Sequence, residues 1–161
     1  SFDLVTKIDI GYYADSIAMN DNTVVIGSPH ENNYVGAVYI YEKDENGVWK
    51  ETMKIVPDDI RQRAVFGSSV SLDGNIIVVG ATNDGEYREG SVYVYRRDRG
   101  SWIQQAKITP PDVTGADELF GSYVSVKKVE YFGGSVSVKN DKIVVDDVGY
   151  DYDDKGAVFV Y

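Results

Sequence analysis

Apolar and polar residues alternate with a period of two along most of the chain, which is the pattern of β-strands. The alternation is most regular in residues 66–108, where four short runs rich in β-branched and aromatic residues are separated by polar turns. The first two runs flank Asp73-Gly74-Asn75, and Asp-Gly favours a tight turn because both residues tolerate positive φ. Residues 66–108 are therefore predicted to form a four-stranded antiparallel sheet.

The same pattern occurs in two further copies. Residues 13–55 match residues 66–108 with a shift of 53 or 54 positions, and residues 132–161 match them with a shift of 66. The third copy ends after its third strand. The sequence therefore predicts one domain, 1–161, built from about three repeated sheets. The densest matches join Gly36-Ala37-Val38-Tyr39-Ile40-Tyr41, Gly90-Ser91-Val92-Tyr93-Val94-Tyr95 and Gly156-Ala157-Val158-Phe159-Val160-Tyr161.

The first residues of the chain resemble the strand that the third copy lacks. Residues 2–8 match Trp102 to Ile108, since both segments place an aromatic residue five positions before a Lys-Ile pair. An N-terminal strand that completes the last sheet is a common way for ring-shaped repeat proteins to close. We therefore expect an all-β fold, a β-propeller of four-stranded antiparallel blades. Residues 2–8 are expected beside residues 156–161 of the same chain or of a neighbouring chain.

One segment breaks the repeat period. Residues 120–128 have the pattern of a first strand, yet another first strand begins at Phe132-Gly133. Propellers typically have about four to eight blades, whereas this chain supplies about three. We interpret residues 120–128 as the first strand of an interrupted blade, and favour a segment missing near Lys128 over an extra strand used elsewhere. The ring is then incomplete unless other chains complete it.

Two dipeptides in the central copy carry a resemblance to a known family. Phe66-Gly67 and Gly80-Ala81 resemble the motif of FG-GAP repeats, which form the blades of integrin α-like propellers. The resemblance implies a propeller that is extracellular or on the cell surface. The first copy departs from the motif with Tyr13-Ala14 and Gly27-Ser28, and the third has Phe132-Gly133 but Asp146-Asp147.

Integrin-like repeats often carry a calcium loop before the strand that ends in Gly-Ala. The corresponding turns here are 20–22, 73–75 and 139–141, and each holds a single carboxylate. Calcium binds roughly six to eight oxygen ligands, so we expect no cofactor at these turns. An acidic run after residue 145 is the one place where several oxygens could converge on a hard cation such as calcium. Its weak metal candidates are Asp147, Asp151 and Asp153.

Composition argues against several classes of function. The net charge of −10 at pH 7 disfavours binding to nucleic acid or to anionic membrane surfaces, because both need a basic face. No apolar run approaches the ~20 residues of a membrane span. Cysteine is absent and His30 is the only histidine, so the chain has no residues for thiolate chemistry or a multi-histidine site. We expect that the chain is not an enzyme.

An aromatic residue recurs in the loop between the second and third strands of each copy. Tyr34, Tyr87 and Tyr152 occupy nearly equivalent places, and Arg88 follows Tyr87. Aromatic residues on one rim of a repeat array offer contact area to a sugar or a protein at little entropic cost. These four residues are the candidate partner-binding residues. Packing between blades explains the tyrosines equally well.

The function expected from the resemblance is a non-catalytic recognition or adhesion module that binds a protein or a glycan. A second possibility is a structural subunit of a ring, fibre or surface assembly, in which chains associate through exposed strand edges. A third, by analogy alone, is an accessory propeller domain of a secreted enzyme.

Overall fold

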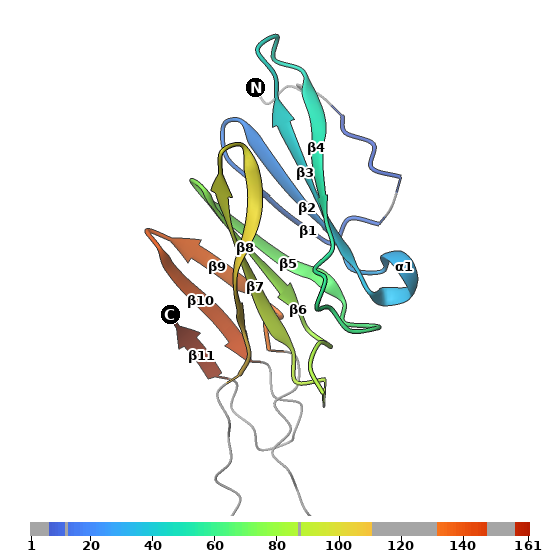
Figure 1. The fold of residues 1–161 in the computed structure, drawn as a ribbon, viewed down its shortest axis with the longest axis vertical. Helices are drawn as coiled ribbons and strands as arrows, with labels where there is room; N and C mark the ends of the chain where they lie inside the picture. The colour runs from blue at the N-terminus through green and yellow to red at the C-terminus, as the bar shows by residue number, and fades with distance from the viewer. Residues whose placement is uncertain (1–6, 12, 87, 111–131, 148–156) are drawn as a thin grey trace, which may run out of the picture.

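The computed structural model describes residues 7–11, 13–86, 88–110, 132–147 and 157–161. Within these residues the strands form three antiparallel sheets that follow one another along the chain (Figure 1). The one helical segment among the described residues is α1 (Glu31–Tyr34), a single turn interrupted by left-handed residues. No helix of the described part is long and apolar enough to cross a bilayer. An all-β chain is thus confirmed.

The first two sheets have four strands each, as the sequence predicts. Their strand orders are β1-β2-β3-β4 and β5-β6-β7-β8, and the third sheet has the order β11-β10-β9. The first sheet contains β1 (Ser16–Met19), β2 (Thr23–Ser28), β3 (Ala37–Lys43) and β4 (Trp49–Ile55). The second contains β5 (Phe66–Asp73), β6 (Ile76–Ala81), β7 (Ser91–Asp98) and β8 (Ser101–Ile108). The third contains β9 (Val136–Lys139), β10 (Lys142–Asp147) and β11 (Ala157–Val160).

The repeat extends to the detail of the backbone. The β3–β4 ladder shifts register between Ile40 and Tyr41, and the β7–β8 ladder shifts at the equivalent place, between Val94 and Tyr95. Gly74, in the turn from β5 to β6, has a φ of 55°, which the Asp-Gly signal anticipates. The first two sheets are therefore copies in conformation as well as in sequence.

Neighbouring sheets pack face to face, and their first strands lie close together. β5 contacts β1 and β2, and β9 contacts β5 and β6. Tyr93, Tyr95 and Trp102 fill the space between the first two sheets, and Phe66 packs edge-to-face on Tyr93 with ring centroids 5.3 Å apart. Between the second and third sheets Phe132 packs on Phe159 in the same manner, at 5.6 Å. The hydrophobic core is thus a series of interfaces between sheets.

Glycines allow the backbones of neighbouring sheets to touch. A Cβ atom on Gly27 would lie 2.1 Å from the carbonyl oxygen of Gly67, and one on Gly80 would lie 2.0 Å from that of Gly133. Any residue with a Cβ would therefore have to move the sheets apart. At each interface the glycine of a Phe-Gly dipeptide meets the glycine of Gly80-Ala81 or, in the first sheet, of Gly27-Ser28.

Hydrogen bonds strengthen the same contacts. The Ser16 hydroxyl donates to the Gly67 carbonyl at 2.9 Å, and the Ser69 hydroxyl donates to the Gly133 carbonyl at 2.8 Å. The Phe66 N–H donates to the Val35 carbonyl at 3.0 Å, which ties the second sheet to the loop after β2. The serines that recur in the first strands therefore join sheets.

The third sheet packs directly on the second, and residues 120–128, including Lys128, lie outside the described residues. The same holds for residues 2–6 of the expected closing strand. Ile8, which is described, packs on the face of the first sheet that points away from the second sheet. β11 belongs to the third sheet, on the opposite side of the second sheet (Figure 1). No closed ring forms within the described residues.

We expect Gly80→Ala to lower the free energy of unfolding strongly, because the new methyl group must separate the second and third sheets. Overpacking at a site without room costs up to about 3 kcal/mol. Urea unfolding followed by circular dichroism measures the loss.

The matched control is Gly47→Ala, because no atom lies within 4 Å of its added Cβ. Gly47 has a φ of 78°, so this variant carries only the left-handed backbone cost, about 1 kcal/mol. Equal losses for the two variants would contradict a backbone contact between the sheets.

Candidate functional site

Three loops meet at one end of the sheets and form what we call the loop rim. These are the β2–β3 loop (29–36), the β4–β5 connection (56–65) and the β6–β7 loop (82–90). The Val65 N–H donates to the Tyr34 carbonyl at 2.8 Å, and the Asn83 N–H donates to the Ala64 carbonyl at 3.0 Å. The rim is therefore one hydrogen-bonded surface, not three independent loops.

Two of the predicted partner-binding residues are described, and both lie exposed on the loop rim. Tyr34 is 49% exposed and Arg88 is also exposed. Each precedes the last glycine of its loop by two positions, Gly36 or Gly90, so Arg88 occupies in the second sheet the place of Tyr34 in the first. Tyr87 and Tyr152 lie outside the described residues.

Several rim residues have backbone conformations that are unusual for residues with a side chain. Tyr34 has a φ of 68°, Arg88 a φ of 62° and Val65 a φ of 63°. A β-branched residue such as valine is rare in the left-handed region. Such strain persists only where the surroundings fix it, and it concentrates at functional sites. It therefore marks the loop rim as the part of the described chain to consider for function.

The structure describes one of the three metal candidates. Asp147 is the last residue of β10, and Asp151 and Asp153 lie outside the described residues. Within the part of the chain that the structure describes, no three acidic, histidine or cysteine side chains gather as metal ligands.

The turn at residues 73–75 of the second sheet contacts the third sheet. Asp73 accepts hydrogen bonds from the Asn140 N–H at 2.8 Å and from the Lys139 ammonium at 3.2 Å. These bonds lower the pKa of the Asp73 carboxyl, the Asn140 N–H contributing most. The carboxylate therefore joins the second sheet to the third.

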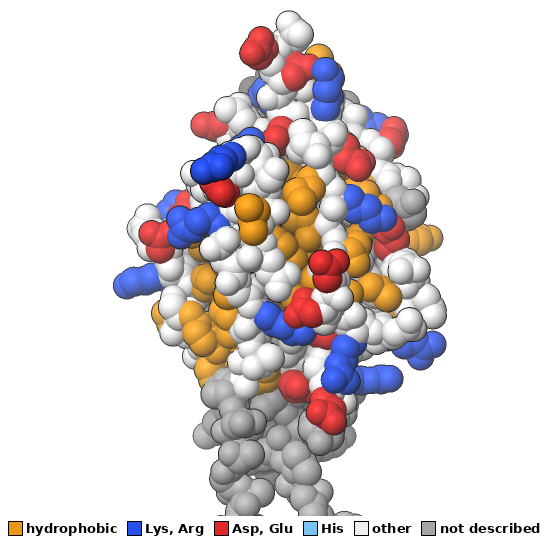
Figure 2. Space-filling view, viewed as in Figure 1, with side chains coloured by type: hydrophobic (Ala, Val, Ile, Leu, Met, Phe, Trp, Pro, Cys, Tyr) orange, Lys and Arg blue, Asp and Glu red, His pale blue; other side chains and the backbone are white. Residues whose placement is uncertain are grey.

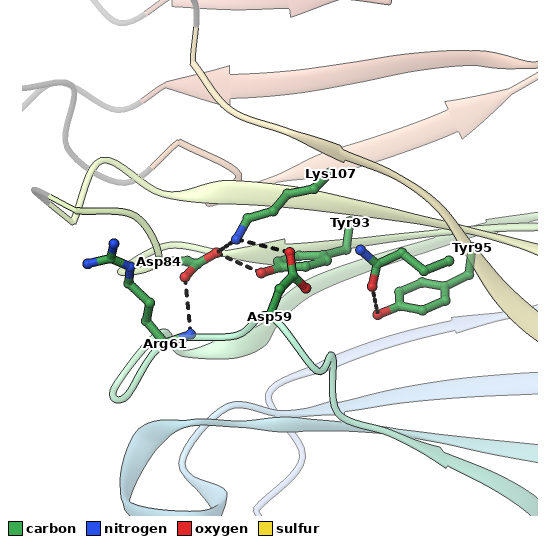
Figure 3. Close-up of polar contacts among 7 residues, drawn as sticks. Asp59, Arg61, Asp84, Tyr93, Tyr95 and Lys107 are labelled. Carbon is green, nitrogen blue, oxygen red and sulfur yellow. Dashed lines mark hydrogen bonds and ion pairs between the residues drawn. The ribbon is translucent and has the colours of Figure 1, made fainter.

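A buried ionic cluster lies beneath the loop rim in the second sheet (Figure 3). Asp84 is fully buried in the β6–β7 loop. Its carboxylate accepts a hydrogen bond from the Tyr93 hydroxyl at 2.7 Å and forms an ion pair with Lys107 at 2.8 Å. Its other oxygen accepts from the Arg61 N–H at 3.4 Å, which connects the β4–β5 segment. Lys107 also reaches Asp59, at 3.5 Å. One carboxylate thus ties together two loops and two strands.

The first sheet repeats this cluster with the same chemistry. Glu31 in the β2–β3 loop accepts a hydrogen bond from the Tyr39 hydroxyl at 2.6 Å and an ion pair from Lys54. Lys54 also lies over the Tyr39 ring, 5.1 Å from its centroid, as Lys107 lies over the Tyr93 ring at 5.0 Å. We call these two sets the acid–tyrosine–lysine clusters.

Four groups in the clusters have shifted pKa values. Burial alone would raise the pKa of Asp84, but hydrogen bonds from Lys107 and Tyr93 outweigh it, so that pKa lies below its ordinary value. Burial and the neighbouring Asp84 raise the pKa of Tyr93. In the first sheet burial and Glu31 raise the pKa of Tyr39 to about 12, and the bond to Glu31 raises that of Lys54 to about 12. Because these shifts move the pKa values away from neutral pH, the groups suit the anchoring of a loop better than proton transfer.

Sequence reasoning missed both clusters, although a signal was present. Glu31 and Asp84, Tyr39 and Tyr93, and Lys54 and Lys107 are each 53 or 54 positions apart, which is the repeat length. A recurring acid, tyrosine and lysine is therefore detectable from the alignment of the copies. Their meeting in space is not, because it depends on the path of the loop.

Residues 49–95 match the FG-GAP repeat family. The match confirms the resemblance carried by Phe66-Gly67 and Gly80-Ala81. It runs from the start of β4 into β7, so it covers the last strand of the first sheet, the first two strands of the second sheet and part of its third strand. No curated protein matches the chain significantly.

We expect Asp84→Asn to lower the free energy of unfolding by about 3 kcal/mol or more, because it leaves the Lys107 charge without its buried partner. Chemical unfolding measures the change. Asp141→Asn is the control: it removes an exposed carboxylate 3.6 Å from Arg96, where the effect should stay within about 0.5 kcal/mol. A loss for Asp84→Asn no larger than that of the control would contradict a structural role for the cluster.

Asp84 also predicts a pH dependence. Its pKa in the folded protein lies below that of an unfolded aspartate, about 3.9. Its contribution to stability is therefore complete above about pH 4 and is lost as the pH falls through the lower folded value. The difference in free energy of unfolding between the wild type and Asp84→Asn should shrink on acidification, as measured by unfolding at a series of pH values. A difference independent of pH would show that Asp84 does not act as a buried carboxylate.

Proposed function

We propose that this chain is part of a β-propeller that acts as a non-catalytic recognition module, located outside the cell or on its surface. The FG-GAP repeat at residues 49–95 and the three sheets that pack face to face support this proposal. The sheets serve as blades, and the loops at one end of the blades serve as the binding surface. Binding residues are commonly carried by loops that a rigid scaffold positions.

The observation that carries the proposal is the repetition of the acid–tyrosine–lysine cluster beneath the loop rim. In each of the first two sheets the cluster acid also accepts, through its backbone carbonyl, the N–H of the glycine that ends the loop. Gly36 donates to Glu31 at 3.0 Å and Gly90 donates to Asp84 at 2.8 Å. Each loop is closed in the same way and tied to its own sheet. A loop fixed before binding loses little conformational entropy when a partner docks.

The chemistry of the rim favours a protein or a glycan as partner. Tyrosine and arginine are enriched among residues that dominate binding energy, and Tyr34 and Arg88 occupy equivalent exposed places. The ring of His30 packs edge-to-face on Tyr34, with centroids 5.3 Å apart, and so limits the orientations of the tyrosine. A fixed aromatic side chain can stack on a sugar ring or fill a shallow pocket of a protein.

The double variant Tyr34→Ala, Arg88→Ala tests the proposal. Binding to a glycan array and to a panel of immobilised extracellular-matrix proteins is first measured for the wild type. We expect the double variant to weaken any binding found by at least about tenfold, because such residues are often worth ~2 kcal/mol. Thermal unfolding should change little, since both side chains are exposed.

Tyr161→Ala is the matched control. Tyr161 is 46% exposed, close to the 49% of Tyr34, and follows the end of β11 away from the loop rim. The control should bind like the wild type. Equal binding by the wild type and the double variant would contradict a role for the rim.

A further inference from the structure

The face of the first sheet that points away from the second sheet is only partly covered. In β1, Ile17 and Met19 occupy the positions that Val70 and Leu72 occupy in β5. Val70 is 9% exposed because the first sheet covers it, whereas Ile17 is 64% exposed. Ile17 and Met19 are therefore equivalent to residues that lie between sheets elsewhere in the chain, but here their side chains are exposed.

The outer face of the third sheet is open in the complementary way. In β11, Val158 and Val160 occupy the positions of Val38 and Ile40 in β3. Val38 is fully buried against the second sheet, whereas Val158 is 67% exposed. Figure 2 shows hydrophobic side chains at the surface over β11. The third sheet therefore has the residues of the covering half of an interface, and its Val158 and Val160 side chains are exposed.

By their positions in the repeat, these two open faces correspond to the two halves of the interface between the first and second sheets. We propose that they dock on each other between two copies of this chain, with the third sheet of one copy covering the first sheet of the other. The contact is head-to-tail, because different surfaces of the two copies meet. Two such contacts join two copies into six sheets, a number within the range of about four to eight at which propellers close.

The position of Ile8 supports this arrangement. Ile8 lies on the open face of the first sheet, as Ile55 lies between the first and second sheets, and each follows a lysine, Lys7 or Lys54. Ile8 therefore occupies the place that the last strand of a preceding sheet would give it. A hollow of about 630 Å³ bordered by Ile8, Ile10 and Tyr13 and another of about 410 Å³ bordered by Ile8, Tyr41 and Trp49 flank it. These hollows leave room for apolar side chains of a docking sheet.

We expect the contact between copies to be weaker than the interfaces within the chain, because it lacks the contact between two glycines. In the proposed contact between copies, the positions of the paired glycines are held by two other residues. Asp146 stands in the place of Gly27 and Gly80, and Ala14 stands in the place of Gly67. Both residues have a Cβ, so the backbones must stay farther apart at this point. The docked copies are therefore held by the apolar strand residues alone, and their association is reversible.

Sedimentation velocity on the 161-residue chain over a series of micromolar concentrations tests the proposal. The wild type should form a species of twice the 17.9 kDa mass of one chain. Ile17→Asp and Val158→Asp each place a charge at the centre of the docking faces, so each should weaken association at least about tenfold. Val56→Asp is the control: Val56 is exposed in the β4–β5 connection, belongs to neither face, and its variant should associate like the wild type.

Mixing the two variants distinguishes a head-to-tail contact from other modes. The third sheet of the Ile17→Asp chain and the first sheet of the Val158→Asp chain are both unaltered, so the mixture should regain association through one intact contact. Wild-type monomers at every concentration would overturn the proposal. Association that Ile17→Asp abolishes and Val158→Asp leaves intact would also overturn it, because two first sheets would then face each other.

Discussion

The contact between glycine backbones of neighbouring sheets sets the spacing on which the rest of the structure depends. Gly27 meets Gly67 and Gly80 meets Gly133, at distances that leave no space for a Cβ atom. This approach lets a serine hydroxyl of one sheet reach a carbonyl of the next, and lets Tyr93 and Tyr95 of β7 fill the wider space between the first two sheets. The two dipeptides of the repeat motif are therefore two sides of a single contact.

The fixed spacing brings the loops of successive sheets together at one end. The acid–tyrosine–lysine clusters then anchor each loop to its own sheet. A buried ion pair is costly to desolvate, and its net contribution to stability is small when the pair is compared with apolar residues. The ion pairs act here by fixing position: Asp84 closes the loop that carries Arg88 and bonds it to Tyr93, and Glu31 closes the loop that carries Tyr34 and bonds it to Tyr39. Stability comes mainly from the apolar interfaces, and the ionic groups determine the shape of the loop rim.

The sequence predicts the strands and the sheets well because both follow from local alternation and from turn residues such as Gly74. It predicts the rim less well. The shift between the first two copies changes from 53 to 54 within the β6–β7 loop. A shift of 53 pairs Tyr34 with Tyr87, whereas counting back from the last glycine of each loop pairs Tyr34 with Arg88, which shares its positive φ. The contact of Asp73 with the third sheet was equally hidden, because a turn carboxylate gives no sign of the neighbour that it binds. Such features depend on how sheets are placed, which local pattern does not encode.

Native-state hydrogen exchange tests most directly the central claim that the sheets form one packed array. The Phe66 N–H bonds to the Val35 carbonyl and the Phe132 N–H bonds to the Glu89 carbonyl, so each amide joins two sheets. The account predicts that both amides exchange as slowly as amides at the centre of β6, because all of them open only when the array unfolds. Exchange of both amides at the rate of exposed loop amides, with β6 still protected, would show that the sheets separate freely and would contradict the account.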